Sequence, residues 1–253
     1  MQVAISNHRL KLASHVRACE SDGQVILLDL LRSRYLGVGA STAKALAEHI
    51  EGWPVHSAGN DSAFSSATIG KLTQPLVAQG LLTEAPPNSL LNALLTTTPD
   101  RFPYPTIEEA TASLDLDDAA TTATIGVRQI AQFMKSAAVV AWWMRCLSLH
   151  SIAVKVSTRR ERLLRPGTDS LEAMLRGTAA YEALRPFVFT AQEKCLHDSL
   201  ALVGFLASQG ALPRWVIGVK TSPFGAHSWV QCGQTVLNDQ HEYVRRFRPI
   251  LVV

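Results

Sequence analysis

The sequence predicts an α+β protein of two domains: a small N-terminal domain of strands and helices, then a larger domain in which helices precede an antiparallel sheet. Three observations support this. Apolar stretches alternate with turn signals up to about residue 85, a proline-rich segment follows, and long helical patterns then give way to strand-like segments after Gly210. A chain of 253 residues with 47% hydrophobic content can bury a core in each half.

The N-terminal half opens with strand signals. Strands are expected near residues 16–20 and 25–29, joined through a Ser-Asp-Gly turn, and a third short strand is expected near residues 35–38. This pattern predicts a three-stranded sheet at the start of the domain.

Two helices should follow these strands. Ser41 is expected to cap a helix that ends at Gly52. A second helix should end at Gly80, and Pro75 inside it should kink it. Its apolar face consists of Ile69, Leu72, Leu76 and Val77. Residues 1–85 therefore have the size and order of a winged-helix domain.

The segment 85–105 contains five prolines and a threonine run, which predicts a linker over residues 86–105. In the second domain, residues 106–253, helices are expected over 107–116 and 125–149, with further helical segments to about residue 181. A helix from about 192 to 209 should precede strands near 214–220, 226–232 and 235–239.

Composition narrows the function. A net charge of +3 is too small to indicate nucleic acid, and the densest basic run, residues 159–165, includes Glu161. That run is interpreted as an exposed helix face, with a phosphate or peptide contact as the alternative. The N-terminus lacks a signal-peptide pattern and the longest apolar stretch, 137–144, is too short for a membrane span. The chain is expected to be soluble and cytoplasmic.

The cysteines draw attention to chemistry. Four cysteines lie far apart in the sequence, which argues against a disulfide framework. Cys195 falls in the first turn of the predicted 192–209 helix, where unpaired N–H groups and the helix dipole favour a thiolate. Cys195 is therefore a candidate nucleophile, the alternative being a small apolar residue at the start of a core helix.

His227 and Asp239 lie at equal distances from Gly233 in the sequence, so a short loop centred there would pair them directly across two strands. Directly opposed residues share a face, with Cβ atoms about 5 Å apart. Asp239 could then hold one imidazole nitrogen and leave the other for the thiol. Trp229 would share this face and Cys232 the other, although a shift of one residue in the turn would break the pairing.

Nucleophile, base and orienting acid in this chain order are typical of Cys-His-Asp acyl-transfer enzymes. The elements CL-x-x-SLAL, IGV, PF-x-AH-x-WV and VLND all occur in order between residues 195 and 239. They resemble the C-terminal part of the lasso peptide maturation B proteins, leader peptidases of the transglutaminase-like, papain-like superfamily. The resemblance implies that Cys195 is the nucleophile, His227 the base and Asp239 the orienting acid.

The same resemblance implies further properties. The substrate would be the leader region of a precursor peptide, and the partner an asparagine-synthetase-like lasso cyclase. The oxyanion would be held by the Cys195 N–H and one further donor, for which Gln192 is a candidate. No metal is implied. Family members require ATP, yet this chain contains no G-x-x-x-x-G-K-[ST] loop, so the requirement is assigned to the pathway.

The N-terminal half resembles the RiPP recognition element, a winged-helix relative of peptide chaperones. The resemblance implies that the leader adds as a strand to the third β-strand and packs on the last helix. The residues at these positions are Tyr35, Leu36, Gly37 and Val38 on the strand and Lys71 and Gln74 on the helix. The alternative is a DNA-binding winged helix, which the modest charge disfavours.

Three alternatives to a leader peptidase remain open on the sequence. Cys195, His197, His227 and Cys232 offer ligand types for zinc, although their spacing is not that of paired metal ligands. A transglutaminase or amidase would use the same triad on another acyl donor or acceptor. A peptide carrier without catalysis would need no triad at all.

Overall fold

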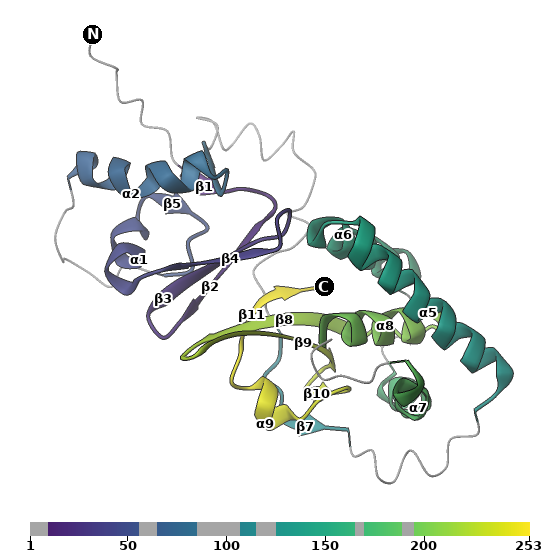
Figure 1. Ribbon diagram of the computed structural model, residues 1–253. Coiled ribbons are helices and arrows are strands. Elements are labelled where there is room, and N and C mark those ends of the chain that lie inside the picture. Colours follow the sequence, from purple (N-terminus) through teal and green to yellow (C-terminus); the bar gives the residue numbers. More distant parts are fainter. Residues whose placement is uncertain (1–9, 56–64, 85–106, 115–124, 165–169, 189–194) are drawn as a thin grey trace. The chain divides into compact units, whose positions relative to one another are not determined.

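The computed structural model describes six ranges of the chain: residues 10–55, 65–84, 107–114, 125–164, 170–188 and 195–253. The chain forms two compact units, residues 1–101 and 102–253, which are described separately (Figure 1). The division falls within the predicted linker, residues 86–105, which lies outside the described ranges, so the linker and the exact domain limits stay predictions.

A three-stranded antiparallel sheet forms the first part of unit 1. Its strand order is β2-β3-β4, with bounds β2 (Val16–Ser21), β3 (Gln24–Asp29) and β4 (Arg34–Val38). Asp22 and Gly23, with φ of 51° and 75°, form the tight turn between β2 and β3, a geometry that Asp-Gly pairs favour. The three predicted strands are confirmed.

A second small sheet was not predicted. It has the order β5-β1-β6, with bounds β1 (Leu10–Leu12), β5 (Ile50–Glu51) and β6 (Leu82–Glu84). These strands are two or three residues long and pair with segments distant in the sequence, so local patterns give little sign of them. The sheet brings the start and the end of the described part of unit 1 together.

The two helices of unit 1 differ in detail from the prediction. The first, α1 (Ala40–Leu46), has Gly39 and not Ser41 at its N-cap, and it ends before Gly52 because residues 50–51 pair with β1. The second, α2 (Ser66–Ala78), contains Pro75 and buries Ile69 and Leu76 as expected. Val77, however, is 43% exposed, so its assignment to the buried face was wrong.

Unit 1 has its own apolar core between the sheets and the helices. Its most buried large side chains come from β3, α1, β5, the following loop, α2 and β6: Leu27, Leu46, Ile50, Trp53, Leu76 and Leu82. Trp53 also donates from its indole N–H to the Ala43 carbonyl at 2.9 Å, which satisfies a buried donor.

Unit 2 is built around one apolar helix, α8 (Cys195–Ser208), which lies between a five-stranded sheet and other helices (Figure 1). The helices that surround it are α5 (Val127–Cys146), α6 (Leu149–Leu163) and α7 (Leu171–Leu184). Phe133, Tyr181 and Phe205 meet edge to face or tilted at their centre, with ring centroids 5.3 to 6.4 Å apart. α8 contacts α5 and α7 among the helices and β8 and β9 in the sheet.

Two helix predictions in unit 2 need adjustment. The helix expected over 125–149 ends at Cys146, because the Ser148 hydroxyl caps α6 by accepting from the Ser151 N–H. The helix expected over 107–116 is wrong throughout its described part. Residues 107–114 contain the short strand β7 (Ala112–Ser113) instead, and the helix-like spacing of Ile107 and Ala110 reflects contact with the sheet core.

The sheet of unit 2 has the strand order β11-β8-β9-β10-β7. Its remaining strands are β8 (Arg214–Thr221), β9 (Phe224–Cys232), β10 (Thr235–Val236) and β11 (Arg248–Val252). The predicted strands over 214–220 and 226–232 are confirmed, whereas the strand predicted over 235–239 ends at Val236. The last strand, β11, and the short helix α9 (His241–Val244) were not predicted. Within the described ranges, no helix combines the length and apolar character needed to cross a membrane.

Gly218 on β8 faces His227 across the ladder and allows close packing of aromatic rings on the sheet. A Cβ atom there would lie 2.7 Å from the Trp229 ring and 2.9 Å from Phe247 Cβ. We expect Gly218→Val to lower the free energy of unfolding by about 1–3 kcal/mol through overpacking, as measured by thermal denaturation. Gly126→Ser is the matched control, since a Cβ added at Gly126 would have no atom within 4 Å. Equal stability of the two variants would contradict this packing.

Candidate active site

The candidate nucleophile stands where the sequence placed it. Cys195 is the first residue of α8, and its side chain is half-buried. The residues before it, 189–194, lie outside the described ranges, and these include the predicted oxyanion donor Gln192. The Cys195 thiol hydrogen-bonds to His227 on β9, so the structure joins two of the three predicted site residues.

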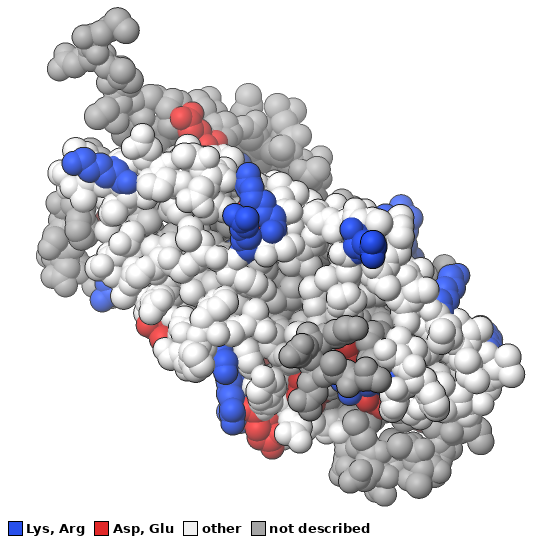
Figure 2. Space-filling model, viewed as in Figure 1, with Lys and Arg blue, Asp and Glu red and all other residues white. Residues whose placement is uncertain are grey.

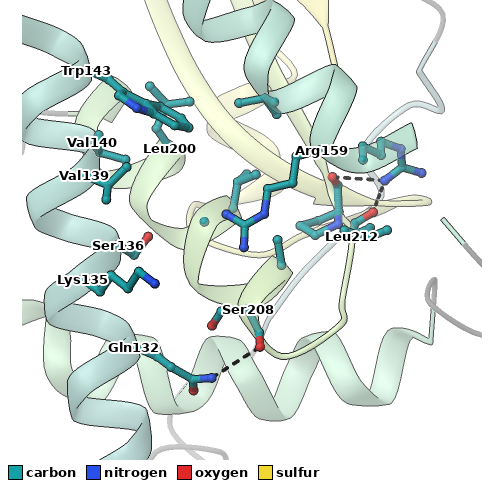
Figure 3. A pocket seen from close by; sticks show the side chains of 16 residues that line it. Gln132, Lys135, Ser136, Val139, Val140, Trp143, Arg159, Leu200, Ser208 and Leu212 are labelled. Atoms are coloured by element: carbon teal, nitrogen blue, oxygen red, sulfur yellow. Dashed lines mark hydrogen bonds between the residues drawn. The ribbon is translucent and has the colours of Figure 1, made fainter. Parts of the chain in front are cut away.

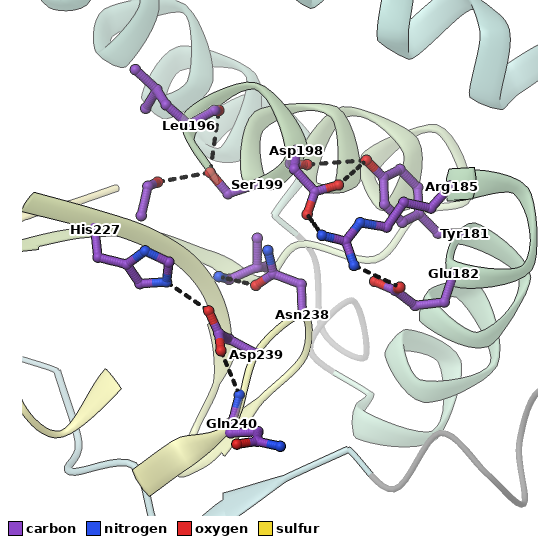
Figure 4. Close-up of polar contacts among 12 residues, drawn as sticks. Tyr181, Glu182, Arg185, Leu196, Asp198, Ser199, His227, Asn238, Asp239 and Gln240 are labelled. Carbon is purple, nitrogen blue, oxygen red and sulfur yellow. Dashed lines mark hydrogen bonds and ion pairs between the residues drawn. The ribbon is translucent and has the colours of Figure 1, made fainter. Parts of the chain in front are cut away.

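The third predicted residue, Asp239, hydrogen-bonds to His227. His227 Nε2 lies 2.6 Å from Asp239 Oδ2, and Asp239 follows β10 in a tight turn (Figure 4). Asp239 also accepts from the Gln240 N–H through its other oxygen, at 2.8 Å. A carboxylate on one side of the imidazole and a thiol on the other is the arrangement that a nucleophilic thiol needs.

The route by which Asp239 reaches His227 differs from the prediction. β9 and β10 pair Cys232 with Thr235, which is a shift of one residue from a loop centred on Gly233. His227 and Asp239 are therefore not opposed in a ladder, because β10 ends at Val236. The chain turns there, and the Asn238 side chain accepts the Val230 N–H at 2.8 Å. This side-chain bond occupies a strand N–H and leaves the next residue, Asp239, directed at the histidine.

The electrostatics of the pair favour charge separation. Burial raises the pKa of the Cys195 thiol, but hydrogen bonds from His227 and from the backbone N–H groups of Ser228 and Leu196 outweigh it, and the net pKa is lowered. Burial lowers the pKa of His227, but its bonds to Asp239 and Cys195 raise it to about 9. Both shifts act in the direction that favours a thiolate–imidazolium pair.

These shifts predict the pH dependence of thiol reactivity. The Cys195 thiolate persists as pH falls until the lowered pKa is reached, and the ion pair with His227 is lost as pH rises through about 9. We expect the alkylation of Cys195 by iodoacetamide to show its inflection at a lower pH than that of an ordinary thiol. Peptide-resolved mass spectrometry measures this, and His227→Gln should move the inflection upward. An unchanged inflection in that variant would contradict the ion pair.

Two buried hydroxyls hold the nucleophile's helix against the strand of the base. Ser199, one turn after Cys195, shares a 2.7 Å hydrogen bond with Ser228, which directly follows His227. Ser228 also accepts the Trp215 indole N–H at 2.8 Å. This serine tether fixes the separation of the Cys195 and His227 backbones.

A buried polar network contacts Asn238, the residue before Asp239, and was not predicted from the sequence. Asp198, with a side chain 6% exposed, receives hydrogen bonds from Tyr181 at 2.9 Å and from Asn238, and pairs with Arg185 at 3.2 Å (Figure 4). Arg185 in turn bonds Glu182 at 3.3 Å, and burial raises the pKa of Glu182 to about 7. The one available signal was Asp198 itself, a charged residue in the apolar face of the 192–209 pattern.

Aromatic rings cover the histidine. Trp229 stacks on His227 at 6.2 Å, as its shared face predicted, while Tyr243 and Phe247 contact the ring at 5.1 and 5.3 Å. Tyr243 lies on the unpredicted helix α9 and Phe247 follows it. These rings limit the access of water to the imidazole and its Asp239 bond.

The six predicted leader-binding residues lie on two elements of unit 1. Tyr35, Leu36, Gly37 and Val38 are on β4, an outer strand of its sheet, while Lys71 and Gln74 are exposed on α2. The main contacts of α2 are with α1 and β6. The strand residues thus occupy a sheet edge, and the helix residues are exposed to solvent.

The proposed zinc alternative finds no support in the geometry. In the parts of the chain that the structure describes, no three His, Cys, Asp or Glu side chains lie close enough to hold a metal ion. His227 uses Nε2 for Asp239 and is bonded to the Cys195 thiol, so its polar groups are already engaged.

Comparison with known proteins relates the part of the chain that carries this site to a superfamily. Residues 139–252 match the family model of the transglutaminase-like superfamily. This transglutaminase-like domain runs from the middle of α5 to the end of β11 and contains all three candidate residues. A stretch of 45 residues is 49% identical to the Microcin J25-processing protein McjB of Escherichia coli, which is 18% of this chain and 22% of McjB. The match therefore spans about a fifth of that relative. No solved structure matches the chain.

Proposed function

We propose that this protein is a cysteine peptidase that removes the leader from a ribosomally made lasso precursor peptide. The observation that carries the proposal is the chain of contacts from the Cys195 thiol through His227 to Asp239, inside a transglutaminase-like domain. The partial likeness to a microcin-processing protein supports a peptide substrate.

In this mechanism the Cys195 thiolate attacks the scissile carbonyl of the leader–core bond. The C–N bond breaks as imidazolium His227 gives its proton to the departing amine of the core peptide. Water, deprotonated by His227, then hydrolyses the thioester, which releases the leader as a carboxylate and regenerates the thiol. Asp239 holds the imidazole in orientation throughout.

The N-terminal unit is proposed to bind the leader. β4 is an outer strand, and an extended peptide could add along it with main-chain hydrogen bonds. Tyr35 and Leu36 are half-buried and Gly37 is exposed, so this edge offers both apolar contact and backbone access. A winged-helix recognition element and a cyclase partner belong to the same proposal.

A transglutaminase or amidase is the second candidate, because the superfamily match fits that chemistry equally well. The acceptor distinguishes a peptidase from a transglutaminase, because a peptidase transfers the acyl group to water and a transglutaminase transfers it to an amine. An amidase also uses water and differs from a peptidase in the amide that it cleaves. The half-buried thiol is compatible with either acceptor.

The test is mass spectrometry of a candidate precursor incubated with the protein in ¹⁸O-labelled water, with and without ATP and an asparagine-synthetase-like cyclase. We expect one cut, with the label in the new leader carboxylate. Transfer to an added primary amine without label would favour the acyltransferase. Leader binding without any cut would indicate a carrier.

A further inference from the structure

Helices α5 and α6 carry an unbalanced charge. Seven of their eight Lys, Arg, Asp and Glu residues are basic, against a net charge of +3 for the whole chain. They are Arg128, Lys135, Arg145, Lys155, Arg159, Arg160 and Arg162, with Glu161 as the acidic exception. Figure 2 shows blue side chains along this part of unit 2, away from the red ones lower down. The charge attracts an anionic partner to these helices.

A cavity of about 230 Å³ opens between α5, α6 and α8 (Figure 3). Its walls are mostly apolar: Val139, Val140, Val156, Leu200, Val203 and Ala207. Hydrogen bonds fix its ends, since Gln132 donates to the Ser208 carbonyl and Arg160 to the carbonyls of Leu212 and Pro213. The cavity is therefore preformed and does not need to open for a ligand.

Besides Arg160, two cations border this cavity, Lys135 and Arg159. Lys135 reaches it from α5, and Arg159 points into it from α6 (Figure 3). Partial burial lowers the pKa of Arg159. Among the described residues, no acidic side chain pairs with either of them. A carboxylate supplied from outside would offset this burial of the guanidinium.

The dimensions indicate what kind of ligand fits. Pockets for drug-sized ligands measure about 300–1,000 Å³, so this cavity suits one large apolar side chain better than a whole cofactor. A membrane surface is too flat to enter a recess between three helices. An acidic peptide supplies both an apolar anchor and carboxylates for its rim.

We propose that the cavity between α5, α6 and α8, with Lys135 and Arg159 at its border, is a groove that binds an acidic segment of a partner protein. One large apolar side chain of that segment would enter the cavity, and flanking carboxylates would pair with Lys135 and Arg159. The groove is distinct from the candidate active site, because it uses the α8 residues from Leu200 to Ser208 and not the Cys195 end. The proposal does not depend on the peptidase function.

Fluorescence anisotropy with the full-length protein tests it. The probe is a fluorescein-labelled peptide in which glutamates flank a central Leu-Leu pair. We expect saturable binding with a Kd below about 1 mM, and weaker binding when lysines replace the glutamates or serines replace the leucines. The double variant Lys135→Gln and Arg159→Gln should raise the Kd about five- to tenfold.

The matched control is Arg145→Gln with Lys155→Gln, which removes the same charge from the same helices at positions that do not line the cavity. It should change the Kd by less than about twofold. Ala207→Leu fills the cavity without changing charge. It should weaken binding of the peptide with leucines and leave binding of the peptide with serines unchanged. The proposal would be overturned if both double variants lost the same affinity for the peptide, or if no saturable peptide binding occurred. It would also be overturned if the protein sedimented with phosphatidylglycerol vesicles and did not bind the peptide.

Discussion

Replacing Cys195 with alanine is expected to lower precursor cleavage by at least about 10⁴-fold, which would put the reaction below detection in an ordinary assay. In the proposed mechanism the thiol forms the acyl–enzyme bond, and Cys195 is the cysteine that hydrogen-bonds to His227. The measurement is the rate of appearance of free leader by mass spectrometry under single-turnover conditions.

Cys146→Ala is the matched control for this loss. Cys146 is an exposed free cysteine at the end of α5, so its removal should leave both the cleavage rate and the stability unchanged. Leader binding by Cys195→Ala should also remain intact. Cleavage by Cys195→Ala at the wild-type rate would show that the Cys195 thiol is not the nucleophile of this reaction.

The second large effect is expected from Asp239→Asn, which keeps the shape of the side chain and removes its charge. The raised pKa of His227 depends on hydrogen bonding to Asp239, so the variant should lower this pKa and weaken the thiolate–imidazolium pair. An amide can also donate to the imidazole and select the other tautomer. We expect kcat to fall about 10³- to 10⁴-fold, with a smaller change in KM.

Its control is Glu172→Gln, which removes an exposed carboxylate that pairs with Arg176 on α7. Such a surface pair contributes little, and kcat should stay within about twofold of wild type. The alkylation profile of Cys195 provides the second readout: its inflection should rise in Asp239→Asn alone. An unaltered kcat together with an unaltered profile would show that Asp239 does not orient the base.

The candidate site could be predicted because each member has a local signal. Cys195 follows from a helix start, and His227 follows from strand alternation. The predicted contact between Asp239 and His227 is present, but it does not arise from direct pairing across two strands. The predicted register was off by one residue, and the contact survives because the chain leaves the strand after Val236 and Asn238 takes over a ladder hydrogen bond.

The rest depends on contacts that a single sequence does not display. Asp198 gains its partners from α7 and from the turn after β10, which are far apart in the chain. The strands β1 and β5 are too short to carry an alternation pattern, and their pairing joins residues about forty positions apart. Long-range pairing and polar networks were therefore found only in the structure.

The serine tether between Ser199 and Ser228 bears on the stage of folding at which the Cys195 thiol becomes reactive. Ser199 and Ser228 meet only after α8 has docked on β9, and the same docking brings the Cys195 thiol to His227. Before that moment Cys195 is an ordinary cysteine without a base. In a nascent or partly unfolded chain the Cys195 thiol is therefore not activated by His227. The reactivity of this thiol reports that α8 has docked on β9.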